Sequence, residues 1–153
     1  MSSNEHLWKP NVTVAAVVTD QDRFLLVEEE TSQGIRYNQP AGHLEPGESL
    51  IEAVIRETRE ETAWGFTPTA LLGVYQYRHP GDRVTYLRFA FTGDIADHQP
   101  RQPLDAGILR ALWMPVEEIR AKQNLHRSPL LLQCVEDHLS GRRFPLDLIH
   151  HYN

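Results

Sequence analysis

Three glutamates, at positions 57, 60 and 61, are the side chains whose types and spacing point most directly to chemistry. Residues 49–62 have the pattern of a helix, and at about 100° per residue the three carboxylates fall in one sector of it. Their like charges repel, at a cost of roughly 0.2 to 0.5 kcal/mol per pair. Mg²⁺ offsets such repulsion because it binds a few carboxylates together with waters and substrate phosphates. A magnesium site is therefore one interpretation of this spacing.

The same acidic sector also fits a helix face that is only solvated, with its charge balanced by Arg56 and Arg59. For an isolated cluster this second interpretation is the commoner one. The sequence offers no covalent nucleophile as an alternative, because Cys134 lies in an apolar segment typical of a core. The residues around the glutamates decide between the two interpretations.

Residues 42–64, GHLEPGESLIEAVIRETREETAW, resemble the Nudix box. That motif consists of glycine, five residues, glutamate, seven residues, Arg-Glu, an aliphatic residue, any residue, Glu-Glu, any residue, glycine and an aliphatic residue. Thr58 stands where a larger aliphatic residue is usual, and Ala63 replaces the glycine that ends the helix. Because alanine adopts positive φ less readily than glycine, we expect the helix to run on towards Gly65. The matching positions are Gly42, Glu48, Arg56, Glu57, Glu60 and Glu61.

The Nudix resemblance implies that Glu57, Glu60 and Glu61 bind one or more Mg²⁺ or Mn²⁺ ions. It adds the carbonyl group of Gly42 as a further metal ligand. Glu60 and Glu61 are the expected catalytic carboxylates, one of which, or another carboxylate through water, would orient the attacking water. The chemistry is consistent, since phosphoryl transfer needs charge neutralisation and an oriented water more than a covalent nucleophile.

Other residues of the segment have supporting or open roles. The pattern implies that Glu48 and Arg56 form an ion pair that fixes the loop to the helix. Glu45 is either a metal or water ligand or an exposed loop acid, and His43 either a hydrogen-bonding residue or a base. Asp105 is the nearest match to a later loop carboxylate that reaches the metals in many Nudix proteins, and the general base is left unassigned.

Substrate contacts are expected mainly on the two strands over residues 68–78 and 84–95. Arg88 lies on the face opposite Leu87 and Phe89 by the period of two, and it is a candidate for a phosphate contact. Tyr75, Tyr77 and Tyr86 are candidates for stacking on a nucleobase or pyrimidine, with Arg127 as a weaker candidate contact. The alternative, surface residues of a sheet, stays open for each of them.

The elements that must position these residues alternate between strands and helices. We expect an α/β protein with a Nudix fold, an α/β/α sandwich on a mixed β-sheet. Residues 41–47 are expected to form a loop. The expected elements are a hairpin of residues 12–19 and 23–28, an extended piece at 35–39, a helix at 49–62, a hairpin of 68–78 and 84–95, a strand at 109–114 and helices at 116–122 and 129–139.

Composition excludes several classes of protein. The 153 residues, 41% hydrophobic and 24% charged, predict one domain over residues 1–153. A single cysteine excludes an intrachain disulfide, and a net charge of -6 disfavours long nucleic acid as a partner. The first ten residues contain charge and proline, and no later stretch approaches about 18 apolar residues. We therefore expect a cytoplasmic protein without a membrane partner.

Beyond the box, the resemblance covers most of the chain and is closest to the NudJ-type phosphatases of the Nudix family. Its further segments are residues 38–45 (NQPAGHLE), 125–130 (LHRSPL) and 140–146 (SGRRFPL). It implies a Mg²⁺-dependent hydrolase, monomeric or homodimeric, whose partner is a small phosphorylated substrate.

The resemblance implies phosphate release from nucleoside tri- and diphosphates or from the thiamine-pathway pyrimidine diphosphate. A pyrophosphatase of ADP-ribose or another nucleoside diphosphate derivative is an alternative within the enzyme class. A non-catalytic Nudix module that senses a nucleotide is an alternative outside it. That last alternative predicts loss of box carboxylates, and all of them are present.

Overall fold

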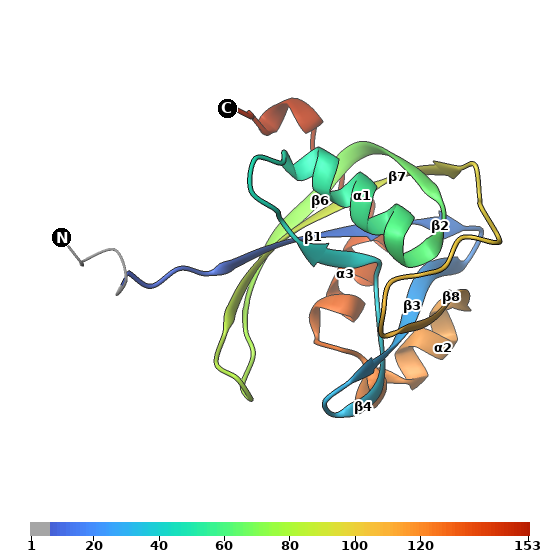
Figure 1. Ribbon diagram of the computed structural model, residues 1–153. Coiled ribbons are helices and arrows are strands. Elements are labelled where there is room, and N and C mark those ends of the chain that lie inside the picture. The colour runs from blue at the N-terminus through green and yellow to red at the C-terminus, as the bar shows by residue number, and fades with distance from the viewer. Residues whose placement is uncertain (1–6) are drawn as a thin grey trace.

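The computed structural model describes residues 7–153, which form two β-sheets with helices on either side (Figure 1). Residues 1–6, which belong to the N-terminal stretch used for the expectation of a cytoplasmic protein, lie outside the described range. Among residues 7–153, no helix combines the length and the apolar character that crossing a membrane requires.

The first sheet is mixed and has the strand order β5-β1-β7-β6. Its central strand β1 (Asn11–Val17) runs parallel to β7 (Thr85–Ala96) and antiparallel to the short edge strand β5 (Ala41–His43). On the far side, β7 forms the expected long hairpin with β6 (Gly65–Arg78). The expected loop over residues 41–47 is thus wrong for its first three residues, which pair with β1.

The second sheet is built around β3 (Arg23–Thr31) and is antiparallel. β3 pairs with β2 (Thr19–Asp20), β4 (Gly34–Asn38) and β8 (Ile108–Pro115). The expected hairpin of residues 12–19 with 23–28 is therefore wrong in part, because only β2 turns back along β3. The preceding apolar run is buried on both faces, as is typical of an interior strand, and it belongs to the mixed sheet.

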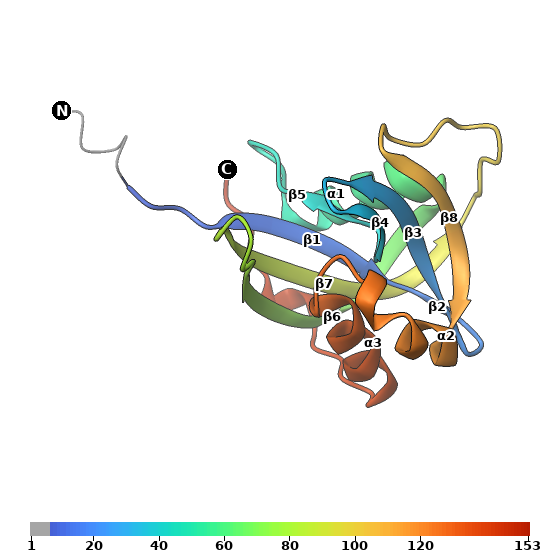
Figure 2. The same ribbon diagram turned by 90° about the horizontal axis from the view of Figure 1, so that it is seen from below.

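Helices cover the strands on both sides, as the two views show (Figures 1 and 2). α1 (Leu50–Thr62) lies on one side, and α2 (Val116–Ala121) and α3 (Leu130–Leu139) lie on the other. Short 3₁₀ turns, η2 and η3, occupy Gln123–Leu125 and Leu146–Leu148. This arrangement confirms the expected α/β class with a mixed sheet between helices.

Strand β1 supplies both cores by its period of two. Val14 and Ala16 pack into the cluster that α1 covers, whereas Ala15 and Val17 pack into the cluster beneath α3. Cys134 of α3 is fully buried in the second cluster, so its assignment to the core is confirmed. Both faces of the mixed sheet are therefore fixed by packing, which leaves the rim around β5 for chemistry.

Both ends of α1 are defined by local hydrogen bonds. The Ser49 hydroxyl accepts a bond from the Glu52 amide at 3.0 Å, and the Glu52 carboxylate accepts one from the Ser49 amide at 2.8 Å. This is the expected capping box. At the other end Ala63 adopts φ 63°, and its amide donates to the Arg59 carbonyl at 2.9 Å. The expected run towards Gly65 is wrong, because Ala63 takes the left-handed conformation that the missing glycine would provide.

The capping box yields a stability prediction. Ser49→Ala removes the acceptor of the Glu52 amide, and we expect the free energy of unfolding to fall by about 1 kcal/mol in urea titration. Ser49→Thr keeps a hydroxyl at the same position and is expected to stay close to the parent protein. An alanine variant as stable as the parent would show that the cap contributes nothing.

Candidate active site

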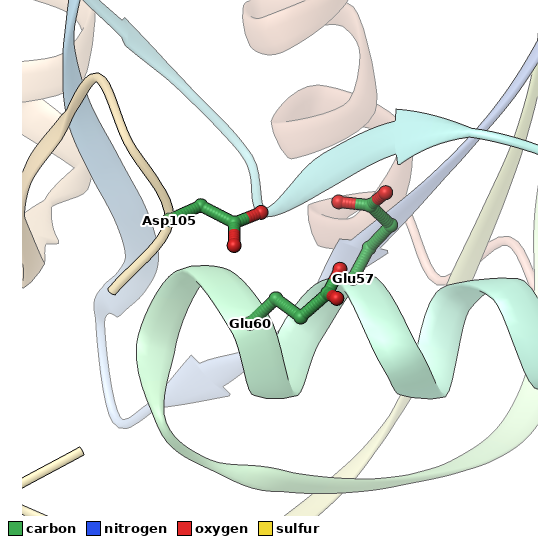
Figure 3. A group of neighbouring side chains, drawn as sticks. All are labelled: Glu57, Glu60 and Asp105. Carbon is green, nitrogen blue, oxygen red and sulfur yellow. The ribbon is translucent and has the colours of Figure 1, made fainter. Parts of the chain in front are cut away.

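Three carboxylates from two separate elements converge beside α1. Glu57 and Glu60 of α1 and Asp105, on the loop between β7 and β8, place one oxygen each within 4.8 Å of one another (Figure 3). The Asp105 amide donates to the Glu60 carbonyl at 3.0 Å, so the loop is tied directly to the helix. Asp105, the nearest match to the later loop carboxylate of many Nudix proteins, thus lies in the cluster. Glu61 does not belong to this trio.

Glu61 lies on the other side of Glu57, facing a cleft. Its Oε1 accepts a hydrogen bond from the Ala41 amide at 2.9 Å, and only 8% of the residue is exposed. Burial raises the pKa of Glu61 to about 8, and neighbouring carboxylates add to the rise, against the Ala41 bond that lowers it. Glu57 lines the same cleft and therefore joins the two acidic groups.

The pKa values of the trio also show that the charges are crowded. Burial raises the pKa of Glu57, against the lowering effect of Arg56. Burial and the charge of Glu60 raise the pKa of Asp105. A raised pKa means that the ionised form is costly where it stands, so a cation at this place is favoured.

Arg56 supplies part of the compensating charge. Its Nε lies 2.6 Å from Glu48, which places the expected supporting pair together. Its NH1 also donates to Glu57 at 2.8 Å and to Glu60 at 2.9 Å, and its NH2 donates to the His43 carbonyl at 3.0 Å. One guanidinium thus joins the loop before α1, the edge strand β5 and two carboxylates of the trio.

Gly42 matters for its lack of a side chain. A Cβ at this position would overlap the Glu57 carboxylate, so only glycine lets α1 approach β5 this closely. The Pro40 carbonyl accepts a bond from β1 at 2.9 Å, and the Leu44 amide donates one to β1 at 3.0 Å. In an antiparallel pair of strands, every second residue forms backbone hydrogen bonds with the partner strand. Gly42 lies two residues from both Pro40 and Leu44, so its carbonyl also faces β1. The backbone groups of Ala41 face the free edge beside Glu61.

A cleft of about 500 Å³ opens over the mixed sheet next to these acids. Tyr77 and Tyr86 are cross-strand partners on β6 and β7, and the ring of His43 lies 6.4 Å from that of Tyr86. The cleft therefore has an acidic end beside α1 and an aromatic end at the β6–β7 hairpin. Its lining includes Glu57, Glu61, Tyr77, Tyr86, Arg88 and Arg127.

Arg88 reaches this cleft from β7 but is only 5% exposed. Its guanidinium donates to the Gln39 Oε1 at 2.9 Å, to the Asn38 Oδ1 at 3.0 Å and to the Cys134 Sγ at 3.8 Å. The alternative of a surface arginine is wrong, because α3 covers this face of the sheet. Two of its partners, Asn38 and Gln39, belong to the segment NQPAGH, and no sequence pattern indicated that they would contact Arg88.

Tyr75 and Arg127 differ from their expected places in opposite ways. Tyr75 is not among the residues that line the cleft, since its hydroxyl donates to Asp137 of α3 at 2.7 Å. The expectation that Tyr75 could stack on the substrate is therefore corrected, because this residue lies beneath α3. Arg127, the weaker candidate, lines the cleft and pairs with Glu29 at 2.6 Å. Glu29 follows an apolar run in β3 and belongs to no motif, so nothing in the sequence pointed to it.

The donor set fits a hard divalent cation. The trio offers only carboxylate oxygens, which come from a rigid helix and an anchored loop, and the crowded charges favour a bound ion. No thiolate or imidazole takes part in the trio, which argues against a site built for a softer metal.

Comparisons with known proteins show the family of this chain. A NUDIX domain model matches residues 9–134. Phosphatase NudJ of Escherichia coli strain K12 is 41% identical over 147 residues, which cover 96% of this chain and 95% of that protein. A NUDIX hydrolase structure from Nitrosomonas europaea is 52% identical with a TM-score of 0.92, over 94% of this chain and 98% of that chain.

A more distant structure shares the fold alone. The NUDIX domain of Shewanella oneidensis NrtR, solved in complex with ADP ribose, is 21% identical with a TM-score of 0.71, over 89% of this chain and 90% of that chain. The family model and the NudJ relative both span most of the present sequence. The chain therefore belongs to the Nudix family and is a phosphohydrolase that acts on phosphoanhydride bonds.

Proposed function

We propose that this protein is a Mg²⁺-dependent hydrolase that releases phosphate from nucleoside tri- or diphosphates or from the thiamine-pathway pyrimidine diphosphate. The observation that carries the proposal is one cleft with carboxylates at one end and a buried arginine and two tyrosines further along. The 41% identity to phosphatase NudJ supports phosphate as the product.

The proposed metal ligands are Glu57, Glu60 and Glu61, to which we add Asp105. Mg²⁺, or Mn²⁺ in its place, supplies positive charge against the phosphoryl oxygens when bound. For the backbone ligand we favour the carbonyl of Ala41 over that of Gly42, because the ladder directs the Gly42 carbonyl at β1. Arg56 holds Glu57 and Glu60 in place through its NH1.

The other residues divide the work of binding and proton handling. Glu60 and Glu61 are the proposed catalytic carboxylates, and the position of Glu61 on the cleft wall suits it to orient the attacking water. Arg88 would bind a phosphate oxygen, while Tyr77 and Tyr86 would hold a flat ring by stacking. Tyr75 has no part in this proposal because its hydroxyl is engaged by Asp137.

Metal dependence is the first test. Clustered carboxylates repel a phosphate, so we expect EDTA to abolish hydrolysis and added Mg²⁺ to restore it. Glu60→Gln and Glu61→Gln are each expected to lower kcat about 100-fold or more, the usual loss for a proton-transfer or charge-stabilising group. Glu117→Gln, on the exposed face of α2, is the matched control. Turnover that survives EDTA would exclude the metal mechanism.

The pKa of Glu61 gives a second test, on stability in EDTA. Burial holds the pKa of Glu61 in the folded protein at about 8, well above the roughly 4.3 of a glutamate in an unfolded chain. Its favourable contribution to stability is therefore complete at low pH and is lost as the pH rises to about 8. The Glu61→Gln variant has no ionisable group at position 61, so this position stays neutral at every pH. The Tm of this variant relative to the parent should therefore rise between pH 5 and pH 8.5, by about 3 °C or more.

The control for that stability test is Glu117→Gln, whose Tm difference from the parent should stay flat with pH. Mg²⁺ should shrink the Glu61→Gln advantage at pH 8.5, because a bound cation stabilises the ionised glutamate of the parent. An advantage that is independent of pH would show that Glu61 is ionised in the folded protein across the whole range.

The bond that is cut is a third test. If water attacks the terminal phosphorus, a nucleoside triphosphate yields diphosphate and phosphate, and ¹⁸O from labelled water appears in the phosphate. The position of the substrate between the acidic residues and Arg88 decides which phosphorus lies in line with the attacking water. Label found only in nucleoside monophosphate, with pyrophosphate as coproduct, would refute phosphate release while leaving the Nudix assignment intact.

A further inference from the structure

Arg88 is a buried cation whose partners are neutral. Its contacts, among the residues that the structure describes, are the amide oxygens of Asn38 and Gln39 and the sulfur of Cys134, and no carboxylate forms an ion pair with it. A buried charge is costly unless an opposite charge or a full set of hydrogen bonds compensates it. The other arginines at the site differ in this respect, because Arg56 and Arg127 both pair with glutamates.

The hydrogen bonds of Arg88 are also incomplete. A guanidinium carries five N–H groups, and the contacts within residues 7–153 account for three of them. Two donors and the whole positive charge therefore stay available on a side chain that lines the cleft. A phosphate oxygen would satisfy both, since charge-assisted bonds from arginine to phosphate are among the strongest polar contacts in proteins.

The two amides are themselves held in orientation. Gln39 is 1% exposed, and its Nε2 donates to the Leu131 carbonyl at 2.9 Å, which leaves its Oε1 facing Arg88. The Asn38 Oδ1 accepts a hydrogen bond from the backbone amide of Gln39 at 3.0 Å as well as one from Arg88. The amide oxygens are thus fixed as acceptors at the positions where carboxylates of nearly the same shape would neutralise the guanidinium.

We propose that Asn38 and Gln39 are positioning residues that hold Arg88 in place without cancelling its charge, so that the cleft selects substrates by a phosphate bound at Arg88. The inference rests on the proposed function and deepens it. Because the side chains of Asn38 and Gln39 are neutral, Arg88 keeps its charge for the anionic part of the substrate. Neither side chain need touch the substrate itself.

Three substitutions separate charge from structure. Asn38→Asp keeps the shape and both accepted bonds while adding a negative charge beside Arg88. Gln39→Glu adds the same charge at the second amide. Gln39→Met removes the two side-chain hydrogen bonds of Gln39 but adds no charge. Gln76→Glu, on the exposed opposite face of β6, controls for net charge.

The expected result is a rise in KM. Steady-state kinetics of Mg²⁺-loaded protein should show KM raised about 10- to 100-fold in Asn38→Asp and Gln39→Glu, with kcat changed less than about threefold. Gln39→Met should raise KM by clearly less, and Gln76→Glu should match the parent. A purely structural role predicts the reverse order, with Gln39→Met the most impaired and Asn38→Asp unaffected, and that order would overturn the proposal.

A binding measurement distinguishes this proposal from the proposed function. Methylenebisphosphonate, which resists hydrolysis, is titrated calorimetrically into the parent, Asn38→Asp and Gln76→Glu with Mg²⁺ present, after thermal melts have established that each is folded. Weakened binding in Asn38→Asp alone supports the inference even if no substrate is turned over. Normal turnover with unchanged KM and binding in Asn38→Asp overturns the inference but leaves the proposed function standing, and a parent that neither binds nor hydrolyses overturns both.

Discussion

Mutual repulsion among carboxylates that are held close together and partly out of water governs the architecture of this site. Glu57, Glu60 and Asp105 meet within 4.8 Å, and Glu61 stands beside them with its pKa raised to about 8. Arg56 compensates some of this charge, but it is shared with Glu48 and so cannot balance the group alone. The remaining negative charge favours binding of a divalent cation, and without a cation it repels phosphate.

The fold holds that charge by means of a few local constraints. The capping box fixes where α1 starts, and Ala63 in the left-handed conformation fixes where it ends. The absence of a side chain at Gly42 lets Glu57 lie against β5, and the bond from the Asp105 amide to Glu60 brings the distant loop to the helix. The capping box uses two side chains and the other constraints lie in the backbone, but none of them is a contact between the carboxylate groups of the site.

The sequence predicted what is local and periodic. The α1 helix, its cap and the β6–β7 hairpin all follow from spacing within a short stretch of chain, whereas the pairing of Glu48 with Arg56 was implied by the resemblance to the Nudix box. It could not predict the partner strands of β1, because a run that is apolar on both faces fits several places in a sheet. The same limit applies to Arg88, whose neighbours Asn38 and Cys134 are distant in sequence, and to Tyr75, which has the same alternation as Tyr77 but is covered by α3.

We propose that the acidic group beside α1 is a divalent cation site that serves the neighbouring cleft. A crystal of the protein soaked in Mn²⁺ and measured near the manganese absorption edge tests it most directly, because the anomalous difference map locates the ion without reference to activity. We expect a peak bound by carboxylate oxygens of Glu57, Glu60 and Asp105, and loss of that peak in a Glu57→Gln crystal. A peak located elsewhere, or none at all in crystals of protein that hydrolyses its substrate, would contradict it.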